Sequence, residues 1–405
     1  MRILVLNAGS SSHKSCLYDL GDSLPDNPFE PIWEAHLDGK NLSVKSKGIK
    51  QHIEVAEKDT ALRTILNTLV AGETKVLDSL NEINFVGHRV VHGGEKYHQA
   101  TVITPEVKQA IADLIPLAPN HNPAHLEGIN TIEEILPQVT QIAVFDTAFH
   151  TTISPAAKIY PIPYQWYEKG IRRYGFHGIS HEYCAHRTAQ ILQQPLESLK
   201  IVTCHLGNGC SLAGIKNGIC VDTTMGFSPL EGLMMGTRCG SIDPQIPLFM
   251  MQEYGLNPEE INHIFNKESG LKGVSGISGD MRAILEAINN GNSQAKIAFD
   301  IYIHCLKKAI GAMVASLNGL DVLVFTAGVG ENSSIVREKS CAGLTYLGLQ
   351  LDLEKNNSFP VDENIATANS SVKVLVIHTQ EDWAIALKVK KSTFPEIKKQ
   401  TNFRT

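Results

Sequence analysis

Two arginines are candidate anion ligands, because each lies in a stretch that is otherwise apolar or rich in glycine. Arg89 interrupts the strand-like run Ile83–Gly94, where a buried charge is costly unless it meets an anion. Arg238 lies in the long loop Gly226–Pro244, whose methionines and leucines indicate a packed loop that lines a site. This segment alone supports two interpretations of Arg89 equally: an ion pair with a carboxylate of the protein, or contact with a bound anionic substrate.

Histidines supply a second group of candidates. His177 and His181 stand four residues apart, just before a predicted helix, with Cys184 and His186 nearby. These residues suggest a zinc site as one alternative, but the pattern is not His-Glu-x-x-His and no well-spaced carboxylate completes the set. A histidine presented to an anionic substrate fits this segment better.

Polar or glycine residues also follow several apolar, strand-like runs. In α/β sheets, ligands collect at the carboxyl ends of the strands. The residues in this position are Asn7, Asp146, His205, Gly328 and Glu381.

Two glycine-rich turns share one layout. Ile201–Ile215 reads as strand, turn and strand, and Ile3–Leu20 repeats the pattern about two hundred residues earlier. Alone, such a turn is more simply a tight hairpin, as at Asn217-Gly218. Its repetition indicates an internal duplication, in which two turns facing one another would offer backbone N–H groups to a nucleotide phosphate chain.

The elements that position these residues are those of an ordinary α/β protein. The chain has 405 residues, enough for two domains, and is 43% apolar and 19% charged. Its net charge of −6 argues against nucleic acid as a partner. We expect no membrane span and no signal peptide, and we interpret the eight scattered cysteines as free thiols of a cytoplasmic protein.

Helical spacing and capping residues predict the main helices. A loop rich in glycine and serine is predicted over Ser269–Asp280, just before a helix start. A further helix is expected to open at Ser333, and its N-terminus would favour an anion. The other predicted helices cover Asp59–Val70, Thr104–Pro116, Pro258–Phe265 and Ala295–Leu317.

Seven ordered motifs together resemble the acetate kinase family over nearly the whole chain. They are Asn7–Ser12, Gly87–Gly94, Phe145–His150, Tyr174–His181, His205–Gly209, Thr237–Gly240 and Gly328–Asn332. The resemblance implies two duplicated ribonuclease H-like domains of the actin-like ATPase type around a nucleotide cleft. We place the first domain at residues 1–150 plus 382–405, where the last helix closes it, and the second at 151–381.

The resemblance also implies a reaction and its residues. The reaction is reversible, in-line phosphoryl transfer from ATP to acetate, giving acetyl phosphate and ADP, with Mg²⁺ or alternatively Mn²⁺. The implied catalytic residues are Arg89, Asp146, His177 and Arg238, and the implied metal ligands are Asn7 and Glu381. The implied acyl pocket consists of Arg89, Val91, His121, Phe176 and Pro229. The implied ATP ligands are Ser10, Ser12, Lys14, His205, Leu206, Gly207, Asn208, Gly209, Asp280, Met281, Arg282, Gly328, Val329, Gly330, Glu331 and Asn332.

The sequence departs from the family pattern at two places. His13 and Ser15 flank Lys14, where apolar residues are usual, and Asn120 precedes His121, where a leucine is usual. A polar residue beside the acyl pocket bears on which acid is preferred. A propionate or other short-chain acyl kinase is therefore the nearest alternative.

Two alternatives come from other classes of protein. An actin-like or chaperone-like ATPase would share the phosphate turns, and a metallohydrolase would use His177, His181, Cys184 and His186. The ATPase would not need two arginines and a histidine beside the γ-phosphate. By resemblance we expect a homodimer, whose other partners are small molecules.

Overall fold

The computed structural model describes residues 1–8, 12–21, 23, 25, 27–55, 61–119 and 121–393. Its contacts divide the chain into unit 1, Met1–Ala148 with Gln380–Thr405, and unit 2, Phe149–Thr379. Each division falls two residues before the expected domain limits at 150 and 381, and it assigns Glu381 to unit 1. The domain limits themselves stay a prediction.

Unit 1 is built on a mixed sheet with the strand order β5-β4-β3-β2-β1-β6-β8-β7. Strand β1 pairs antiparallel with β2 and parallel with β6, and β6 pairs parallel with β8. The strands are β1 (Arg2–Ala8), β2 (Ser12–Asp19), β3 (Trp33–Asp38), β4 (Asn41–Ser46), β5 (Ile49–Glu54), β6 (Phe85–Val90), β7 (Thr101–Val102) and β8 (Thr140–Phe145).

Unit 2 repeats this arrangement in a sheet with the order β11-β10-β9-β12-β14-β13. Strand β9 pairs antiparallel with β10 and parallel with β12, which in turn pairs parallel with β14. The order β3-β2-β1-β6-β8 thus corresponds to β11-β10-β9-β12-β14, which confirms the predicted duplicated α/β fold. The strands are β9 (Lys200–Leu206), β10 (Cys210–Lys216), β11 (Ile219–Thr223), β12 (Val322–Thr326), β13 (Glu363–Asn364) and β14 (Lys373–Val376).

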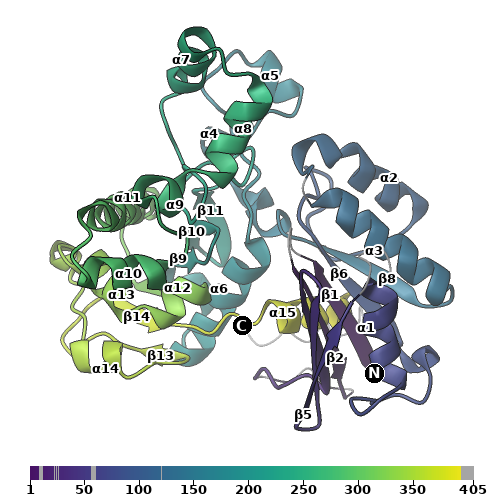
Figure 1. Cartoon of the computed structure of the whole chain (residues 1–405). Helices are drawn as coiled ribbons and strands as arrows, with labels where there is room; N and C mark the ends of the chain where they lie inside the picture. The colour runs from purple at the N-terminus through teal and green to yellow at the C-terminus, as the bar shows by residue number, and fades with distance from the viewer. Residues whose placement is uncertain are drawn as a thin grey trace. The chain divides into compact units, whose positions relative to one another are not determined.

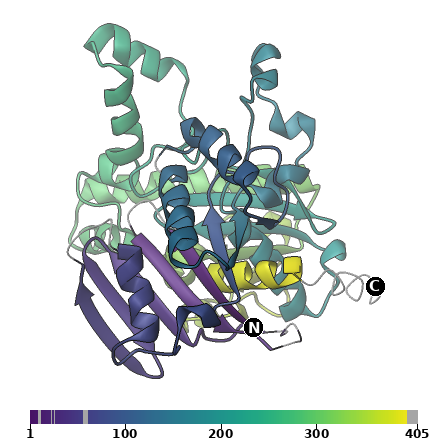
Figure 2. The same cartoon turned by 90° about the vertical axis from the view of Figure 1, so that its right-hand side faces the viewer.

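Helices cover both faces of the sheet in unit 1. Leu66 of α1 and Ile132 of α3 join one apolar core with Leu4 and Leu6 of β1. The opposite face carries α15, which lies against the strands in Figure 2. A Cβ at Gly87 of β6 would lie 2.7 Å from Val389 of α15, so only glycine permits this close packing. The helices are α1 (Ala61–Val70), α2 (Pro105–Asp113), α3 (Asn122–Ile135) and α15 (Glu381–Thr393).

Two long helices cover the sheet of unit 2, α6 on one face and α11 on the other (Figure 1). Cys184 and Ala185 of α6 join the core of Ile201, Ala213 and Val324. The helices are α4 (Pro155–Lys158), α5 (Gln165–Glu168), α6 (Gly178–Leu192), α7 (Gln245–Tyr254), α8 (Pro258–Lys267), α9 (Gly270–Ser275), α10 (Met281–Asn289), α11 (Ser293–Leu317), α12 (Ala327–Asn332), α13 (Ser334–Cys341) and α14 (Leu353–Asn357).

Several local predictions are confirmed. Asn217 and Gly218 have φ angles of 55° and 76°, as the first and second turn residues of a type I′ hairpin require. The loop after β11 runs without a helix or strand to α7, and it buries Leu233 and Met235. Ser333 is the N-cap of α13, where a helix start was expected.

Others are wrong. The predicted loop Ser269–Asp280 contains α9, a short helix whose glycines sequence propensity disfavours. A helix was expected to begin only at Ser333, but the preceding motif Gly328–Asn332 already forms most of the short helix α12. The helix expected from Thr104 to about Pro116 is present, with Thr104 as its N-cap, but it ends at Asp113. Helix α1 is also present and ends at Val70 as predicted; residues 59 and 60, where its start was expected, lie outside the described residues.

One region of unit 2 extends away from its sheet. Helices α7 and α8 stand apart from β9–β11 in Figure 1, with α4 and α5 beside them. No residue of α7 is buried, and Leu248, Phe249 and Tyr254 expose 47%, 55% and 72% of their surfaces. Among all the described residues, no helix is both long enough and apolar enough to cross a lipid bilayer.

Candidate active site

Alternation along the first two strands brings polar residues to the α15 face of unit 1. Leu4 and Leu6 join the core on the α1 face, so Asn7 shares the opposite face with Ile3 and Val5. Lys14 lies opposite Asn7 in the β1–β2 ladder. The predicted metal ligand and the predicted phosphate ligand are therefore neighbours.

Asp382, in the first turn of α15, joins these two residues. Its Oδ1 accepts a hydrogen bond from Asn7 Nδ2 at 2.9 Å, and its Oδ2 lies 2.7 Å from Lys14 Nζ. The carboxylate is 5% exposed, so both partners hold a buried charge in place. Asp382 is not among the residues predicted from the sequence, although it directly follows the predicted metal ligand Glu381 in the first turn of α15.

Arg89 and Asp146 form a buried ion pair at the ends of β6 and β8. Arg89 Nη2 lies 2.6 Å from Asp146 Oδ2, and Nη1 donates to Asn7 Oδ1 at 3.2 Å. Burial opposes the charge of Arg89, but Asp146 and then Glu381 outweigh it and raise its pKa. Arg89 Nε and Asp146 Oδ1 are buried without a partner among the described residues. The ion pair interpretation of Arg89 is therefore correct.

The other site residues predicted in unit 1 are described here one by one. Val91 is buried just after β6, and His121 immediately precedes α3. Glu381 opens α15 rather than ending a strand. Ser10 and Asn120 lie outside the described residues, and Ser12 is described only as the first residue of β2.

In unit 2, His177 stands at the N-terminus of α6 in a left-handed conformation with φ of 57°. A non-glycine residue in that region marks a strained position that its surroundings must stabilise. The ring stacks on His205 of β9 with a centroid distance of 4.2 Å. Its Nδ1 lies 2.9 Å from Ser211 Oγ.

Arg238 and His177 meet at Gly209, in the turn between β9 and β10. A Cβ at Gly209 would lie 3.0 Å from Arg238 Nη2 and 3.5 Å from His177 Nε2. Arg238 Nη1 donates to the Pro229 carbonyl at 2.7 Å, and no carboxylate of the described residues pairs with the guanidinium. Burial lowers the pKa of Arg238, because its charge lacks a compensating anion.

Two of the predicted acyl-pocket residues lie in unit 2, next to Arg238 and His177. Pro229 holds Arg238 through its carbonyl, and Phe176, 2% exposed, directly precedes His177. The Phe176 carbonyl lies 3.0 Å from His150 Nε2. Both residues therefore shape the surroundings of the candidate catalytic side chains.

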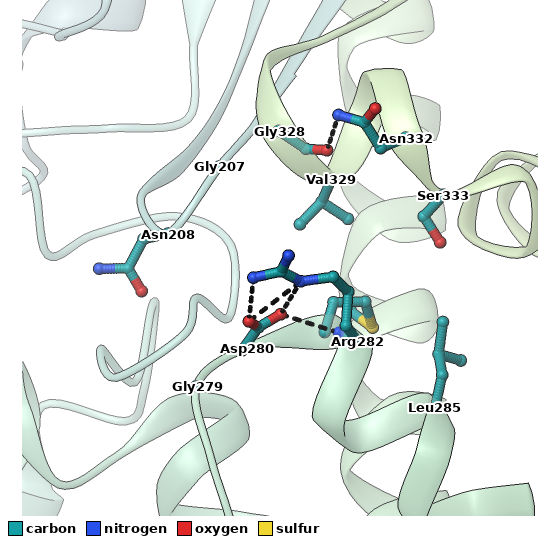
Figure 3. A pocket seen from close by; sticks show the side chains of 11 residues that line it. Gly207, Asn208, Gly279, Asp280, Arg282, Leu285, Gly328, Val329, Asn332 and Ser333 are labelled. Atoms are coloured by element: carbon teal, nitrogen blue, oxygen red, sulfur yellow. Dashed lines mark hydrogen bonds and ion pairs between the residues drawn. The ribbon is translucent and has the colours of Figure 1, made fainter. Parts of the chain in front are cut away.

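A pocket of about 570 Å³ opens in unit 2 (Figure 3). Arg282 and Asp280 pair with each other at 2.6 Å beside it, and Val329 and Leu285 add apolar surface. Its other lining residues come from three segments: Gly207, Asn208, Gly279, Met281, Gly328, Asn332 and Ser333. Eight predicted ATP ligands are thus brought together. Ser333 was predicted only as a helix start that favours an anion, whereas Gly279 and Leu285 were missed, the latter because a helix face cannot be assigned to a cavity from sequence.

Other predicted ATP ligands do not line this pocket. His205 stacks on His177, Leu206 is fully buried, and Gly330 is also buried. The Glu331 carboxylate accepts hydrogen bonds from the backbone N–H groups of Ala327 and Thr379, at 2.8 and 3.0 Å. Glu331 thus holds α12 in place.

The histidine segment forms no metal centre in the described part of the chain, where no group of three or more His, Cys, Asp or Glu side chains is arranged to hold a metal. His181 instead lies 2.7 Å from both Thr203 Oγ1 and Ser211 Oγ through its two ring nitrogens. The eight cysteines are free thiols.

Comparisons with known proteins agree on one family. An acetokinase family model matches residues 2–387. An acetate kinase of Gloeothece citriformis is 61% identical over 395 residues, which cover 95% of this chain and 98% of that protein. An acetate kinase of a Synechocystis strain is 58% identical, over 95% of this chain and 96% of that protein.

Solved structures give the same result. The crystal structure of Porphyromonas gingivalis acetate kinase matches with a TM-score of 0.90 and 40% identity, covering 97% of this chain and 100% of that chain. A Francisella tularensis propionate kinase matches with a TM-score of 0.87 and 36% identity, covering 96% and 98%. The sequence match, the duplicated sheets and the grouping of Arg238 with His177 lead to one conclusion: the chain belongs to the acetokinase family.

Proposed function

We propose that this protein is an acetate kinase, which reversibly transfers the γ-phosphoryl group of ATP to acetate. An acetate oxygen forms a bond to the γ-phosphorus while the bond to the β,γ-bridging oxygen breaks, giving acetyl phosphate and ADP. The observation that carries the proposal is the uncompensated Arg238 guanidinium beside His177 and the Gly209 turn. The 61% identity with an acetate kinase supports the choice of substrate.

Charge cancellation is the main task in this reaction, because a carboxylate and a triphosphate are both anions. Phosphoryl transfer needs positioning and electrostatic stabilisation rather than covalent catalysis. Arg238 supplies a cation that no described carboxylate neutralises. His177 would stabilise the transferring phosphoryl group from the same side of Gly209.

Arg89 and Asp146 have a different task in this proposal. Acetate is already ionised near pH 7, so no strong base is needed. Asp146 pairs with Arg89 through Oδ2. The buried Nε of Arg89 has no hydrogen-bond partner among the described residues. Arg89 would therefore bind the substrate carboxylate, and Asp146 would position it.

The residues of unit 1 also fit a Mg²⁺ ion. Mg²⁺ prefers oxygen ligands and usually keeps waters and substrate phosphates, so one or two protein oxygens suffice. Asn7 offers an amide oxygen, Glu381 a carboxylate, and Asp146 Oδ1 is a buried acceptor without a described partner. When bound, the ion would add positive charge at the phosphates. Asn7 and Glu381 would hold it.

The pocket of about 570 Å³ is where we propose that the nucleoside part of ATP binds. It is lined by the Asn208 turn on one side and by α10 and α12 on the others. Apolar side chains such as Val329 and Leu285 suit a base, and Arg282 suits a phosphate.

Trapping of the product as a hydroxamate tests the proposal. Purified protein with Mg·ATP is given acetate, propionate or butyrate, and acyl phosphate is trapped with hydroxylamine. We expect the largest yield with acetate. Propionate as the best substrate would favour the second candidate, for which the 36% identical propionate kinase structure is the supporting observation. If none of the three acids gives a trapped product, the protein is not an acyl kinase.

We also propose that the protein is a cytoplasmic homodimer, formed through the face of α7. A helix with no buried residue and exposed Leu248, Phe249 and Tyr254 is typical of a surface that a partner covers. Sedimentation of Phe249→Glu tests this, because a buried carboxylate should disrupt the dimer. A matched Phe359→Glu change, at an exposed site outside α7, is the control.

A further inference from the structure

Glu231 lies in the same loop as Arg238, and its carboxylate binds two side chains from another segment of unit 2. Its Oε1 lies 2.7 Å from Nη2 of Arg173, and its Oε2 accepts a hydrogen bond from the Tyr160 hydroxyl. Tyr160 follows α4, and Arg173 stands four residues before His177. Glu231, Tyr160 and Arg173 form what we call the Glu231 cluster. The cluster therefore connects the segment that leads to His177 with the loop that carries Arg238.

Both partners of Glu231 also hold backbone groups at the start of the loop. The N–H group of Phe227 donates to Tyr160 Oη at 2.8 Å. An amide N–H can only donate and a phenol has one hydrogen, so Tyr160 gives its own hydrogen to Glu231. Burial, and then the bond to Glu231, raise the pKa of Tyr160, so the phenol keeps this hydrogen. Arg173 Nη1 lies 3.2 to 3.3 Å from the carbonyl oxygens of Thr223, Thr224 and Met225.

Two glycines allow the loop backbone to approach the cluster closely. A Cβ at Gly226 would clash with Oε2 of Glu231 and with Oη of Tyr160. A Cβ at Gly232, where φ is 110°, would lie 2.8 Å from the Thr224 carbonyl oxygen, which the cluster also holds. Both glycines are therefore packed against groups that the Glu231 cluster fixes.

Pro229 lies between these glycines and is the residue that holds Arg238. Its carbonyl accepts the hydrogen bond from Arg238 Nη1 at 2.7 Å. Phe227 and Glu231, two positions before and two positions after Pro229, are both bound to Tyr160. The position of the Pro229 carbonyl, and with it the position of the guanidinium, therefore depends on the cluster.

We propose that Glu231, with Tyr160 and Arg173, is a positioning residue that fixes the Arg238 guanidinium through the Pro229 carbonyl. The three side chains act through the loop and need no contact with the substrate. A cation that is already in place stabilises a developing negative charge without rearrangement, so a small displacement of it lowers the rate. This inference rests on the proposed kinase function.

Glu231→Gln tests whether the cluster acts through Arg238. An amide has a single oxygen, so it cannot accept from Tyr160 and Arg173 at its two ends. We expect a kcat lowered about tenfold, with the KM for Mg·ATP within about twofold. In an Arg238→Ala background the same change should lower kcat by less than about twofold, because the group that it positions is absent. An unchanged kcat in Glu231→Gln, or equal losses in the two backgrounds, would overturn the proposal.

Tyr160→Phe removes only the hydroxyl group and should give the same pattern, so it serves as the test if Glu231→Gln does not fold. Tyr346→Phe, at an exposed tyrosine of unit 2, and Glu338→Gln, at an exposed ion pair with Lys339, are the matched controls. Both controls should keep the constants of the wild type. A thermal midpoint that falls in Tyr160→Phe while kcat stays unchanged below the transition would show a purely structural cluster and would refute the positioning role.

Hydrogen exchange tests the cluster without turnover. In Tyr160→Phe we expect faster deuterium uptake at Phe227, whose N–H loses its acceptor, and also at Met235, whose N–H donates to the Arg238 carbonyl at 3.1 Å. Faster uptake at Phe227 alone would mean that the cluster does not control the part of the loop near Arg238, and the proposal would be wrong. If the protein makes no acyl phosphate, the kinase function fails, whereas this measurement still decides whether the cluster holds the loop.

Discussion

Asn7 donates a hydrogen bond from Nδ2 to Oδ1 of Asp382 over 2.9 Å, although the two residues are 375 positions apart in the chain. Asp382 holds Lys14 with its other carboxylate oxygen. One buried carboxylate thus orients two of the residues assigned to metal and phosphate binding, and the assignment can be tested at Asp382 itself.

Asp382→Asn should lower kcat about tenfold to a hundredfold, the usual scale for losing a group that orients ligands. The amide keeps the shape but loses the charge that holds Lys14. We expect the KM for Mg·ATP to rise more than the KM for acetate. Asp19→Asn, which removes a half-exposed carboxylate from the same sheet, is the control. Equal steady-state constants for Asp382→Asn and wild type would exclude this role.

Gly209→Ala should reduce kcat strongly while the fold remains intact. The added methyl group would lie 3.0 Å from Arg238 Nη2 and 3.4 Å from His177 Cε1, so both side chains must move. Gly311→Ala is the matched control, because a Cβ at that helical position meets nothing within 4 Å. Circular dichroism and kinetics of both variants check the prediction, which fails if the two behave alike.

Arg238→Ala should lower kcat by about 10² to 10³, the cost of losing one preorganised donor to a developing charge. The side chain makes no described ion pair, so its removal should hardly change the thermal midpoint. Arg63→Ala, at an exposed ion pair with Glu134, controls for the loss of an arginine. Turnover close to that of the control would remove Arg238 from the site.

Acid should destabilise the protein partly through His88. Burial lowers the pKa of His88 to about 4, against an ordinary value of 6.5 in the unfolded chain. The unfolded state therefore binds the proton first, and the stabilising contribution present above pH 6.5 is lost as the pH falls toward 4. Urea unfolding between pH 7.5 and 5 should show a smaller loss of stability for His88→Gln than for wild type. His36→Gln, at an exposed position of the same sheet, should lose as much as wild type.

Much of this architecture is readable from residue pattern. The type I′ hairpin at Asn217-Gly218 and the repeated strand, turn and strand layout follow from local rules, and they led to the duplicated fold. Arg238 was recognisable because a charged residue in a packed loop needs an anion. Local sequence pattern therefore identifies turn residues, and it identifies charged residues that lie in otherwise apolar segments.

Relationships between distant segments were not readable in this way. Glu381 and Asp382 are adjacent acids, and only the packing of α15 on β1 decides that Asp382 faces Asn7. The pairing of Thr203 with His181 likewise depends on which face of β9 the helix α6 covers. Helix α9 was missed because its tertiary contacts override the low helix propensity of its glycines.

The close packing of α15 against Gly87 has a consequence for synthesis on the ribosome. The strands of unit 1 are made first, but the helix that covers one face of their sheet follows the whole of unit 2 in the chain. Unit 2 is continuous and has all its strands before α15 emerges. All the strands of unit 2 are therefore synthesised before α15, and the apolar face of β1 and β6 stays uncovered until this last helix is made.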